Sequence, residues 1–566
     1  MQQMKLPPRE VKRLFFPYWS LRNRQAIVVL VILVAVLLSG SAFNAWITHF
    51  TRDSYNAIEK RDFALFKVAV TQSMMAFALS AALFTFDTWL KQWVEFNWRK
   101  SLTDVFASRW LAGNTFYRLE RQQRTDNPDQ RIAEDVRLFT EQTVGLGFSF
   151  ITNLGLLSSF GYLLWTVAGS VTIAGVTIHG YMFWVAIGFG LSNTGITHWA
   201  GRRLSTIRMN QQRVEGDFRF ALSQQREYAE QIAFYDGGPV ELGRLRHLFS
   251  HIAANWGQVM RQTLKLNFVH LNVNSYSSLV PILVISPKLF SGELTLGEMM
   301  QNNMAYGATV MAVSWFANSY GSLVSWSAIT RRLIGLNAAL DEQEQRGIAL
   351  AEAKQPVLKA RELQMALPDG APLADIGALR FEPGGRWLIK GASGAGKSTL
   401  LRTLAGLWPY GRGSVELPPR GSMMFVPQKS YIPAGTLKEA LCYPKSVDQF
   451  SDEACRRALV ACRLPQLVGE LHDSARWAHR LSGGEQQRLA FARVLLARPG
   501  FIFLDEATSA LDNPTEAALY TALGEQLGEA AVISVAHRAT LEKYHDQALE
   551  LAQGRAATRP LAASAC

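Results

Sequence analysis

The hydrophobic pattern changes in the middle of the chain. Long apolar runs fill the first 330 or so residues, whereas short apolar strands alternate with helical segments from about Ala360. A run of about twenty apolar residues is long enough to cross a bilayer as a helix. The pattern predicts six spans, the last two interrupted by Asn, Gln and Pro: Ala26 to Ile47, Phe66 to Leu90, Val144 to Ala168, Tyr181 to Ala200, Phe268 to Phe290 and Leu296 to Trp326.

Arginine and lysine mark the loops that are expected to stay in the cytoplasm. The segments before the first span, between the second and third, and between the fourth and fifth are rich in both residues. The loop GSVTIAGVTIHG, between the third and fourth spans, has neither. Positive charge favours the cytoplasmic side, so both termini are predicted to face the cytoplasm. The two basic inner loops are too long for simple connectors and are predicted to continue as helices out of the membrane.

One of these inner loops carries a helix-start pattern, TDNPDQRIAEDV. Asn127 can cap a helix, Pro128 suits its first position, and Gln130, after Asp129, can bond back to the cap. The pattern predicts a short helix at the tip of a cytoplasmic hairpin. It is either a coupling helix that docks on the domain formed by the second half of the chain or an ordinary capped surface helix, and the spacing does not choose between them.

Polar residues within the last two predicted spans allow two interpretations. A lipid-facing amide is costly, so such residues line a cavity more often than they contact lipid. They are candidates to line a translocation path, but hydrogen bonding between packed helices explains them equally well. The residues are His270 to Ser278, Glu298, Gln301, Asn302 and Asn303.

Composition supports a membrane protein and argues against nucleic-acid binding. Of the 566 residues, 48% are hydrophobic and 18% charged, which is more apolar than a typical soluble chain. The net charge of +12 sits in segments that flank apolar runs, not in a basic patch interleaved with aromatics. The four cysteines form no C-x-x-C pair, so no zinc or redox site is expected. The basic start of the chain, MQQMKLPPREVKRLFFPYW, is predicted to be a retained interfacial helix, not a signal peptide.

The second half of the chain contains a motif that predicts a phosphate-binding loop. The strand Trp387 to Lys390 runs into G-x-x-x-x-G-K-S and then a helix, which is the context this motif requires. Backbone N–H groups of the loop and the helix N-terminus favour phosphate oxygens. Lys397 would reach the β and γ phosphates, and the Ser398 hydroxyl would hold Mg²⁺. The predicted ATP-binding residues are Gly391, Ala392, Ser393, Gly394, Ala395, Gly396, Lys397, Ser398 and Thr399.

Carboxylates at the end of an apolar strand supply the candidate catalytic groups. The run FIFLDE reads as a buried parallel strand that ends in Asp505 and Glu506. Asp505 is expected to coordinate Mg²⁺ through water, and Glu506 to polarise the attacking water. Gln428, in FVPQKS, would lie between Mg²⁺, water and the membrane domain, and His537, after the strand AAVISVAH, would contact the γ-phosphate.

The order of these motifs resembles that of the ABC transporters. GASGAGKS, VPQ, LSGGEQQR, FIFLDE, SALD and His537 follow one another as in an ATP-binding cassette, across about Ala360 to Gln553. The resemblance implies that the signature loop caps the γ-phosphate of an ATP held by the opposite subunit, with the dipole of the following helix aimed at that anion. With one cassette and about six spans, the chain is then expected to work as a homodimer. The signature residues are Leu481, Ser482, Gly483, Gly484, Glu485 and Gln486.

The membrane half resembles a narrower group. DNPDQRIAEDV and EQIAFYDGGPVE are similar to the inner loops of bacterial SbmA/BacA-like transporters, especially the YddA-like and mycobacterial BacA-type members fused to a cassette. The second loop also resembles a segment of the peroxisomal fatty-acyl ABCD transporters. The resemblance implies coupling roles for Glu230 and Tyr235 beside Asn127 to Gln130. One departure is Leu367, which stands where many cassettes carry an aromatic residue that stacks on adenine.

These observations predict a six-helix transmembrane domain of the exporter-like type IV fold, fused to an α/β P-loop ATPase domain. The predicted divisions are an amphipathic segment (1–25), the transmembrane domain (26–345), a linker (346–359), the ATPase domain (360–555) and a tail (556–566). The resemblance implies ATP- and Mg²⁺-dependent transport across a bacterial inner membrane, with uptake of peptides, cobalamin or other hydrophilic solutes expected. Export of lipid-like or acyl compounds, or a membrane-anchored ATPase that gates or senses without transport, are the alternatives.

Overall fold

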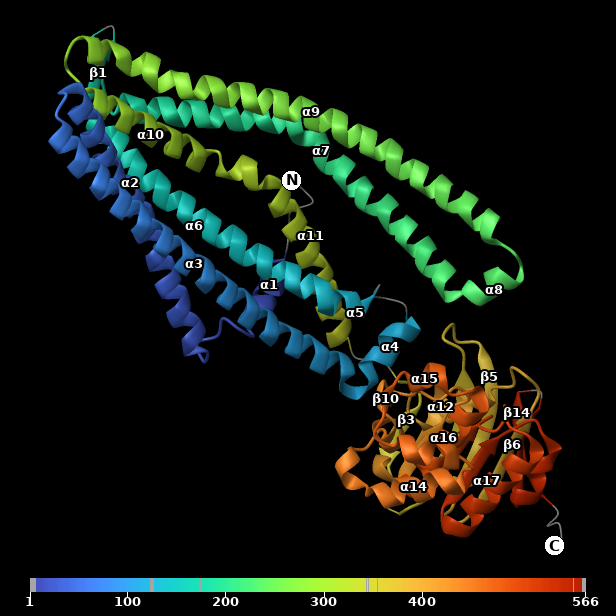
Figure 1. Ribbon diagram of the computed structural model, residues 1–566. Helices are drawn as coiled ribbons and strands as arrows, with labels where there is room; N and C mark the ends of the chain where they lie inside the picture. The colour runs from blue at the N-terminus through green and yellow to red at the C-terminus, as the bar shows by residue number, and fades with distance from the viewer. Residues whose placement is uncertain are drawn as a thin grey trace. The chain divides into compact units, whose positions relative to one another are not determined.

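The computed structural model describes residues 7–122, 127–173, 175–342, 344, 346–353, 355–552 and 554–561, and the chain divides into two compact units (Figure 1). The first comprises Met1–Asp341 and the second Glu342–Cys566.

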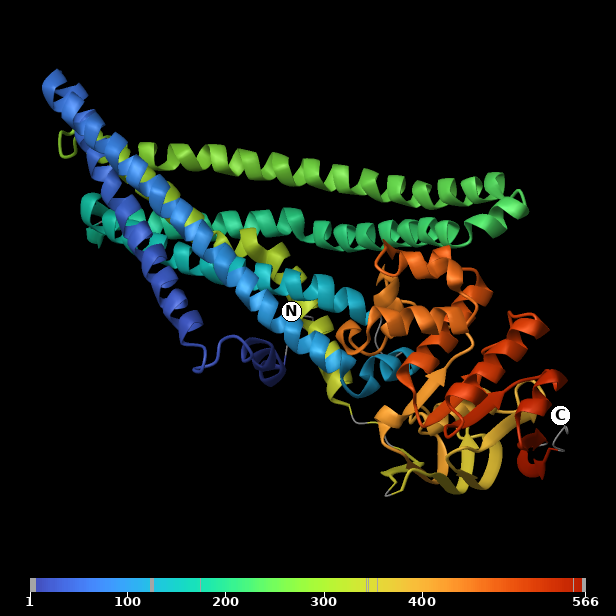
Figure 2. The same ribbon diagram turned by 60° about the horizontal axis from the view of Figure 1, so that its bottom comes forward.

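The first unit consists mainly of long helices. Figures 1 and 2 show α7 and α9 running side by side as a hairpin, with α8 where the two helices join. The helices are α1 (Pro8–Phe15), α2 (Arg24–Glu59), α3 (Phe63–Leu111), α4 (Thr115–Gln122), α5 (Pro128–Gln130), α6 (Val136–Val167), α7 (Tyr181–Glu227), α8 (Ala229–Phe234), α9 (Gly238–Phe290), α10 (Leu296–Val313) and α11 (Trp315–Asp341). A 3₁₀ turn (Ala112–Asn114) precedes α4, and a π-helical turn (Arg131–Asp135) joins α5 to α6.

Four described helical stretches are long and apolar enough to cross a membrane: Arg24–Glu59, Phe63–Gln122, Pro128–Val167 and Gly238–Phe290. The predicted fourth span, at the start of α7, is not among them; its apolar run is interrupted by Asn193, Thr194 and His198. The predicted sixth span is divided at Ser314 between α10 and α11. A count of six spans therefore stays a prediction.

The helix start predicted at Asn127 and Pro128 is confirmed, but the predicted capping bonds and the predicted short length are wrong. Asn127 is left-handed (φ 45°, ψ 66°) and its side chain makes no capping bond within the described residues. Gln130 Nε2 donates to Glu134 Oε2 over 3.0 Å instead of bonding back to Asn127. Pro128 begins a continuous helical stretch of 40 residues that ends at Val167. The motif thus starts the long helix that contains the third predicted span.

Two further features of the first unit were not predicted. The segment between α6 and α7 forms an antiparallel hairpin of β1 (Ser170–Ile173) and β2 (Val176–His179). Lys288 at the end of α9 supports it, because its Nζ donates to the carbonyls of Ala168 (2.9 Å) and Ser170 (2.6 Å).

The second unit is built on a ten-stranded sheet with the order β3-β7-β4-β5-β14-β13-β6-β12-β11-β8. Strands β13, β6, β12, β11 and β8 run parallel, and their apolar residues lie in the core as buried parallel strands require. The strands are β3 (Ala349–Glu352), β4 (Leu358–Ala366), β5 (Pro372–Phe381), β6 (Arg386–Gly391), β7 (Gly411–Leu417), β8 (Met423–Val426), β11 (Phe501–Asp505), β12 (Ala531–Val535), β13 (Gln547–Ala552) and β14 (Arg555–Pro560).

Helices flank this sheet, and the unit has two apolar cores, one of which joins residues of the parallel strands to residues of a helical layer. A two-stranded pair, β9 (Gly435–Thr436) and β10 (Ser474–Ala475), ties this layer together. The helices are α12 (Lys397–Leu404), α13 (Leu437–Cys442), α14 (Asp452–Ala461), α15 (Trp477–Arg480), α16 (Gly483–Ala497) and α17 (Asn513–Gln526).

Candidate nucleotide site

The phosphate loop joins the end of β6 to the start of α12, as the sequence predicts. Its conformation depends on glycine: Gly391 and Gly396 have φ values of 153° and 94°. A Cβ atom on Gly391 would lie 2.5 Å from the carbonyl oxygen of Leu551, so a side chain cannot fit there. Gly396 occupies the N-cap of α12, which leaves the first N–H groups of that helix available to an anion.

Lys397 is held inside the loop. Its Nζ donates to the carbonyls of Gly391 (2.9 Å) and Ala392 (2.8 Å), and the side chain is buried. Burial lowers the pKa of this lysine, while Glu506 and Asp505 act in the opposite direction. The ammonium group of Lys397 is therefore fixed by the loop, and the nearby carboxylates favour its charged form.

Two oxygen ligands suited to Mg²⁺ meet beside the loop. Ser398 Oγ donates to Asp505 Oδ1 over 3.1 Å, which joins the first turn of α12 to the end of β11. Burial raises the pKa of Asp505, and the bond from Ser398 opposes that rise. A hydroxyl and a carboxylate are hard oxygen donors of the type that Mg²⁺ prefers, and a cation between them would offset the cost of burying this carboxylate. The residues present therefore fit the metal.

Glu506 is the centre of a second cluster. It takes a left-handed conformation (φ 48°) directly after β11, and its N–H donates to the carbonyl of Val535 over 3.0 Å. Gln428 Nε2 donates to Glu506 Oε2 over 3.0 Å, and His537 Nε2 lies 3.4 Å from Glu506 Oε1. Three residues that are far apart in sequence thus meet at the carboxyl ends of neighbouring parallel strands.

The signature segment forms a well-capped helix start. Ser482 is the N-cap of α16; its N–H donates to Glu485 Oε2 over 2.9 Å, and its Oγ accepts from the Glu485 N–H. The Ser482 N–H and the Ser482 Oγ, which also donates to Glu485 Oε2 over 2.8 Å, lower the pKa of Glu485. Gln486 Nε2 donates to the carbonyl of Leu481 over 2.9 Å. Ser482 and Gly483 are exposed, so the N-terminal end of this 15-residue helix is accessible from outside the subunit.

The signature residues and the phosphate loop share no hydrogen bond or ion pair among the described parts of the chain. Glu485 Oε1 instead accepts a hydrogen bond from Gln466 Nε2, outside the segment, over 3.2 Å. Gln487, just after the segment, accepts from the N–H of Ala510 (2.9 Å) and donates to Ser509 (3.1 Å), in the SALD segment.

Two arginines that the sequence analysis did not single out connect the functional segments. Arg493 of α16 donates to the carbonyls of Ala440 (2.8 Å) and Tyr431 (2.7 Å), and burial lowers its pKa to about 10. Arg538, next to His537, donates to the carbonyls of Leu511 and Ser509. The sequence could have indicated Arg538 only through its position next to the predicted histidine. No sequence pattern indicated Arg493, because its partners are backbone carbonyls.

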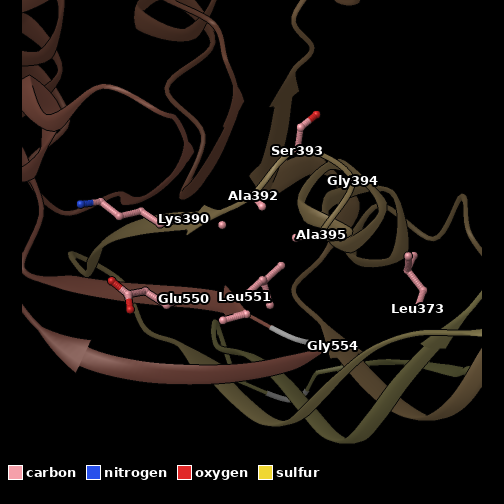
Figure 3. Close-up of a pocket in the computed structure, with 11 residues that line it drawn as sticks. Leu373, Lys390, Ala392, Ser393, Gly394, Ala395, Glu550, Leu551 and Gly554 are labelled. Atoms are coloured by element: carbon pink, nitrogen blue, oxygen red, sulfur yellow. The ribbon is translucent and has the colours of Figure 1, made fainter.

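A pocket of about 630 Å³ lies beside the phosphate loop. Figure 3 shows Ala392 to Ala395 along one side of it, with Lys390 and Glu550 at one end and Leu373 at the other. No aromatic side chain lines the pocket within the part of the chain that is described. Leu367, in the turn between β4 and β5, is 38% exposed. An accessible aliphatic side chain therefore stands at the position where many cassettes have an aromatic residue.

A buried histidine of the second unit, His545, makes the stability of that unit depend on pH. His545 Nε2 lies 2.9 Å from Ser534 Oγ of β12, and Nδ1 lies 2.7 Å from the carbonyl of Leu541. Burial lowers the His545 pKa from 6.5 to about 4. Between pH 6.5 and pH 4, the unfolded chain binds a proton at His545 and the folded chain does not. The stabilisation is therefore fully present above pH 6.5 and is lost as the pH falls towards 4.

Between pH 7 and pH 5, this histidine is expected to lower the free energy of unfolding of the ATPase unit by about 2 kcal/mol. The measurement is denaturant unfolding at both pH values, followed by fluorescence. His545→Asn should remove that share of the pH dependence even if it lowers stability at pH 7. An unchanged difference between the two pH values in the variant would show that other groups cause it.

The residues with predicted coupling roles lie on different parts of the first unit. Asn127 to Gln130 stand at the start of the stretch that leads into α6, as described above. Glu230 is on α8, and Tyr235 follows that helix with 86% of its surface exposed. Phe234 is also exposed. The tip of the α7–α9 hairpin thus presents aromatic side chains with no covering from its own unit.

Comparison with known proteins agrees with this arrangement. The family model described as ABC transporter transmembrane region 2 matches residues 11–290, and the model described as ABC transporter matches residues 376–509. The inner membrane ABC transporter ATP-binding protein YddA of Escherichia coli is 32% identical over 533 residues, covering 92% of this chain and 93% of the relative. The human lysosomal cobalamin transporter ABCD4 is 28% identical, covering 96% and 94%.

A plant relative shows the same extent of similarity. The chloroplastic ABC transporter D family member 2 of Arabidopsis thaliana is 28% identical, covering 94% of this chain and 85% of the relative. Both the helical unit and the ATPase unit are therefore shared with these proteins. The chain belongs to the ABC transporter family, as a multi-pass membrane protein in which a helical membrane region is fused to an ATPase domain and ATP hydrolysis is coupled to transport.

Proposed function

We propose that two copies of this chain form a transporter of the SbmA/BacA-like fused type in the bacterial inner membrane, which takes up peptides, cobalamin or other hydrophilic solutes. The observation that best supports a dimer is that the N-terminal end of α16 is exposed. Its Ser482 and Gly483 face solvent, and no hydrogen bond ties the signature residues to the phosphate loop of the same chain within the described residues. A helix N-terminus favours an anion, so a second copy's ATP γ-phosphate is a suitable partner.

Within each ATP site, the geometry supports the proposed role of each residue. Glu506 accepts a hydrogen bond from Gln428, lies near His537, and is suited to orient the attacking water. Lys397 and the loop N–H groups would bind the phosphates, with Gly391 to Thr399 surrounding them. Ser398, Asp505 and Gln428 would hold Mg²⁺, which, when bound, neutralises charge that develops on the phosphate oxygens. The protein's contribution is positioning and electrostatic stabilisation.

A cavity in the membrane unit supports solute transport over a purely sensory role. It has a volume of about 770 Å³ and lies among α6, α7, α9 and α11. Its lining mixes apolar residues with polar ones, including His198, Asn318, Tyr320 and Ser325. This size and mixture are typical of small-molecule sites.

The polar residues predicted to line a path are not among those that line this cavity. Gln301 is fully buried and its Nε2 donates to Thr48 of α2 over 3.0 Å. Asn302 Nδ2 donates to the carbonyl of Glu298, whose own carboxylate caps α10 at Thr295. For these residues, the alternative of helix-to-helix and intrahelical bonding explains the polar side chains.

The proposed orientation places both termini and the ATPase domain in the cytoplasm, as the basic inner loops favour. The proposed divisions are 1–25, 26–345, 346–359, 360–555 and 556–566. β3 lies within the proposed linker and most of β14 within the proposed tail, and both strands belong to the ten-stranded sheet. In this arrangement Asn127 to Gln130 and the α8 region, with Glu230 and Tyr235, would transmit the closure of the ATPase domains to the spans. Export of acyl compounds, or gating without transport, would use the same ATP site.

A flux assay tests this proposal. Proteoliposomes with outward-facing ATPase domains are loaded with labelled cobalamin or a cationic proline-rich peptide, and external ATP is added. Import predicts ATP-dependent loss of label from the lumen, which represents the periplasm, and no loss with the Glu506→Gln variant. ATP-dependent accumulation of external label would show export instead. Hydrolysis without movement of either solute would contradict the proposed substrates.

The nucleotide base is expected to be held weakly. Stacking of a base on an aromatic side chain contributes about 1–3 kcal/mol, and the accessible Leu367 offers no such ring. Leu367→Tyr is therefore expected to lower the Kd for ATP by at least about fivefold, as measured by fluorescent-nucleotide displacement. Val460→Tyr, which adds tyrosine at an exposed position of α14, is the matched control. Equal affinities in the two variants would show that position 367 does not contact the base.

A further inference from the structure

The N-terminal helix α1 packs against the membrane unit through one face only. Leu14 is 1% exposed and Tyr18, just after the helix, is 5% exposed. Phe15 contacts the ring of Trp98 on α3, with centroids 5.0 Å apart. By contrast, Phe16 and Leu21, which follow the helix, are 65% and 88% exposed. Apolar residues therefore point both into the unit and away from it.

The exposed side of this segment is strongly basic. Between positions 9 and 24 there is one acidic residue, Glu10, against five basic ones: Arg9, Lys12, Arg13, Arg22 and Arg24. Basic and exposed apolar side chains together are typical of a segment that lies at a membrane surface and attracts anionic lipid.

Four charged groups meet where α1 contacts α3 and α11, one of them Glu10, whose Oε2 lies 3.6 Å from Arg13 Nη1. Arg109 Nη2 lies 2.5 Å from Asp341 Oδ1, and Arg13 Nη1 lies 3.3 Å from Asp341 Oδ2. Arg109 Nη1 also donates to Asn337 Oδ1 over 2.7 Å. The Asp341 side chain is 51% exposed. Because exposed ion pairs contribute little stability, another anion can replace this carboxylate at small cost.

A pocket of about 310 Å³ opens at this junction. Its lining combines the charged groups Arg13, Arg109 and Asp341 and the amide of Asn337 with a set of apolar residues. The apolar residues are Leu14, Pro17, Leu102, Val105 and Phe106. Two guanidinium groups above an apolar floor match a ligand that has a phosphate group next to hydrocarbon.

We propose that this pocket binds the headgroup phosphate of an anionic phospholipid. The phosphate oxygens accept hydrogen bonds from Arg13 and Arg109, and the glycerol and first acyl carbons contact the apolar floor. The phosphate takes the place of Asp341, which is the last residue of α11 and of the first unit. Lipid binding thereby releases the end of the helix that leads directly into the ATPase unit, and anionic lipid raises ATP turnover.

Binding to the full-length protein in detergent tests the site. Short-chain phosphatidylglycerol, short-chain phosphatidylcholine and inorganic phosphate are titrated by calorimetry. We expect phosphatidylglycerol to bind more tightly than either of the others. Arg13→Gln/Arg109→Gln should weaken phosphatidylglycerol binding at least about tenfold, because each basic group near a lipid surface contributes about fivefold in affinity. Arg9→Gln/Arg22→Gln removes the same charge outside the pocket and should bind nearly as the wild type does.

A second variant separates the pocket from the ion pairs. Val105→Trp keeps both arginines and fills the space, so it should weaken phosphatidylglycerol binding by a similar factor. Equal losses in the two double variants would show a diffuse charge effect, and equal binding of inorganic phosphate would show a free-anion site; either result overturns the proposal. In vesicles, phosphatidylglycerol should raise ATP hydrolysis of the wild type and of Arg9→Gln/Arg22→Gln. The absence of any stimulation in the wild type would overturn the regulatory part.

Discussion

Replacing Glu506 by glutamine is expected to lower ATP hydrolysis at least about 100-fold, since a positioned general base contributes 10²–10⁴-fold. The substitution keeps the size of the side chain and its contacts with Gln428 and His537, but removes the carboxylate that orients and polarises water. ATP binding should change little, because the phosphate loop is untouched. Phosphate release in the steady state and fluorescent-ATP binding by the full-length protein measure the two effects.

The matched control for this variant is Glu525→Gln, the same change at an exposed position of α17. It should hydrolyse ATP at the wild-type rate. If the Glu506 variant retained normal turnover, the cluster around Glu506 would have no catalytic role, and the water would have to be oriented by another group. If it lost ATP binding as well, its effect would be structural.

Ser482→Arg is expected to reduce hydrolysis by a comparable factor while leaving ATP binding to the phosphate loop within a few-fold of normal. The arginine replaces the N-cap of α16 and places a long cation at the exposed helix end that, in our account, must approach a phosphate on the other subunit. Loss of a serine cap alone costs about 1 kcal/mol of stability, which is too little to abolish activity in a folded protein.

Ser451→Arg separates capping from function. Ser451 is also an exposed serine N-cap, and its side chain accepts from the N–H of Ala454 at the start of α14. Both variants should lose similar stability, but the Ser451 variant should keep its ATPase activity. Equal activities of the two variants would remove Ser482 from the ATP site.

The ATP site was largely predictable because its geometry depends on local motifs at the ends of parallel strands. A strand–loop–helix segment fixes Lys397 and Ser398, and the apolar strand before Asp505 and Glu506 places both at the same sheet edge. The predicted neighbours Gln428 and His537 do lie beside Glu506. Their shared position follows from strand order, which motifs imply only through family resemblance.

The membrane unit was harder to predict because its polar residues depend on tertiary contacts. Gln301 bonds to Thr48, more than 250 positions away in sequence, and no pattern marks such a pair. Asn127 has the composition of a helix cap but adopts a left-handed conformation, and Gln130 bonds forward to Glu134. The junction of Arg13, Arg109 and Asp341 joins three distant helices and was equally invisible in the sequence.

The central claim is that a second copy completes each ATP site, and a mixed dimer tests it most directly. One copy carries Ser482→Arg and the other Lys397→Ala, with different affinity tags, so that sequential purification yields only mixed dimers. Each variant alone should be inactive. In the mixed dimer, the intact phosphate loop of the first copy faces the intact signature of the second, so ATP hydrolysis should return. A mixed dimer as inactive as either variant alone would contradict the shared site.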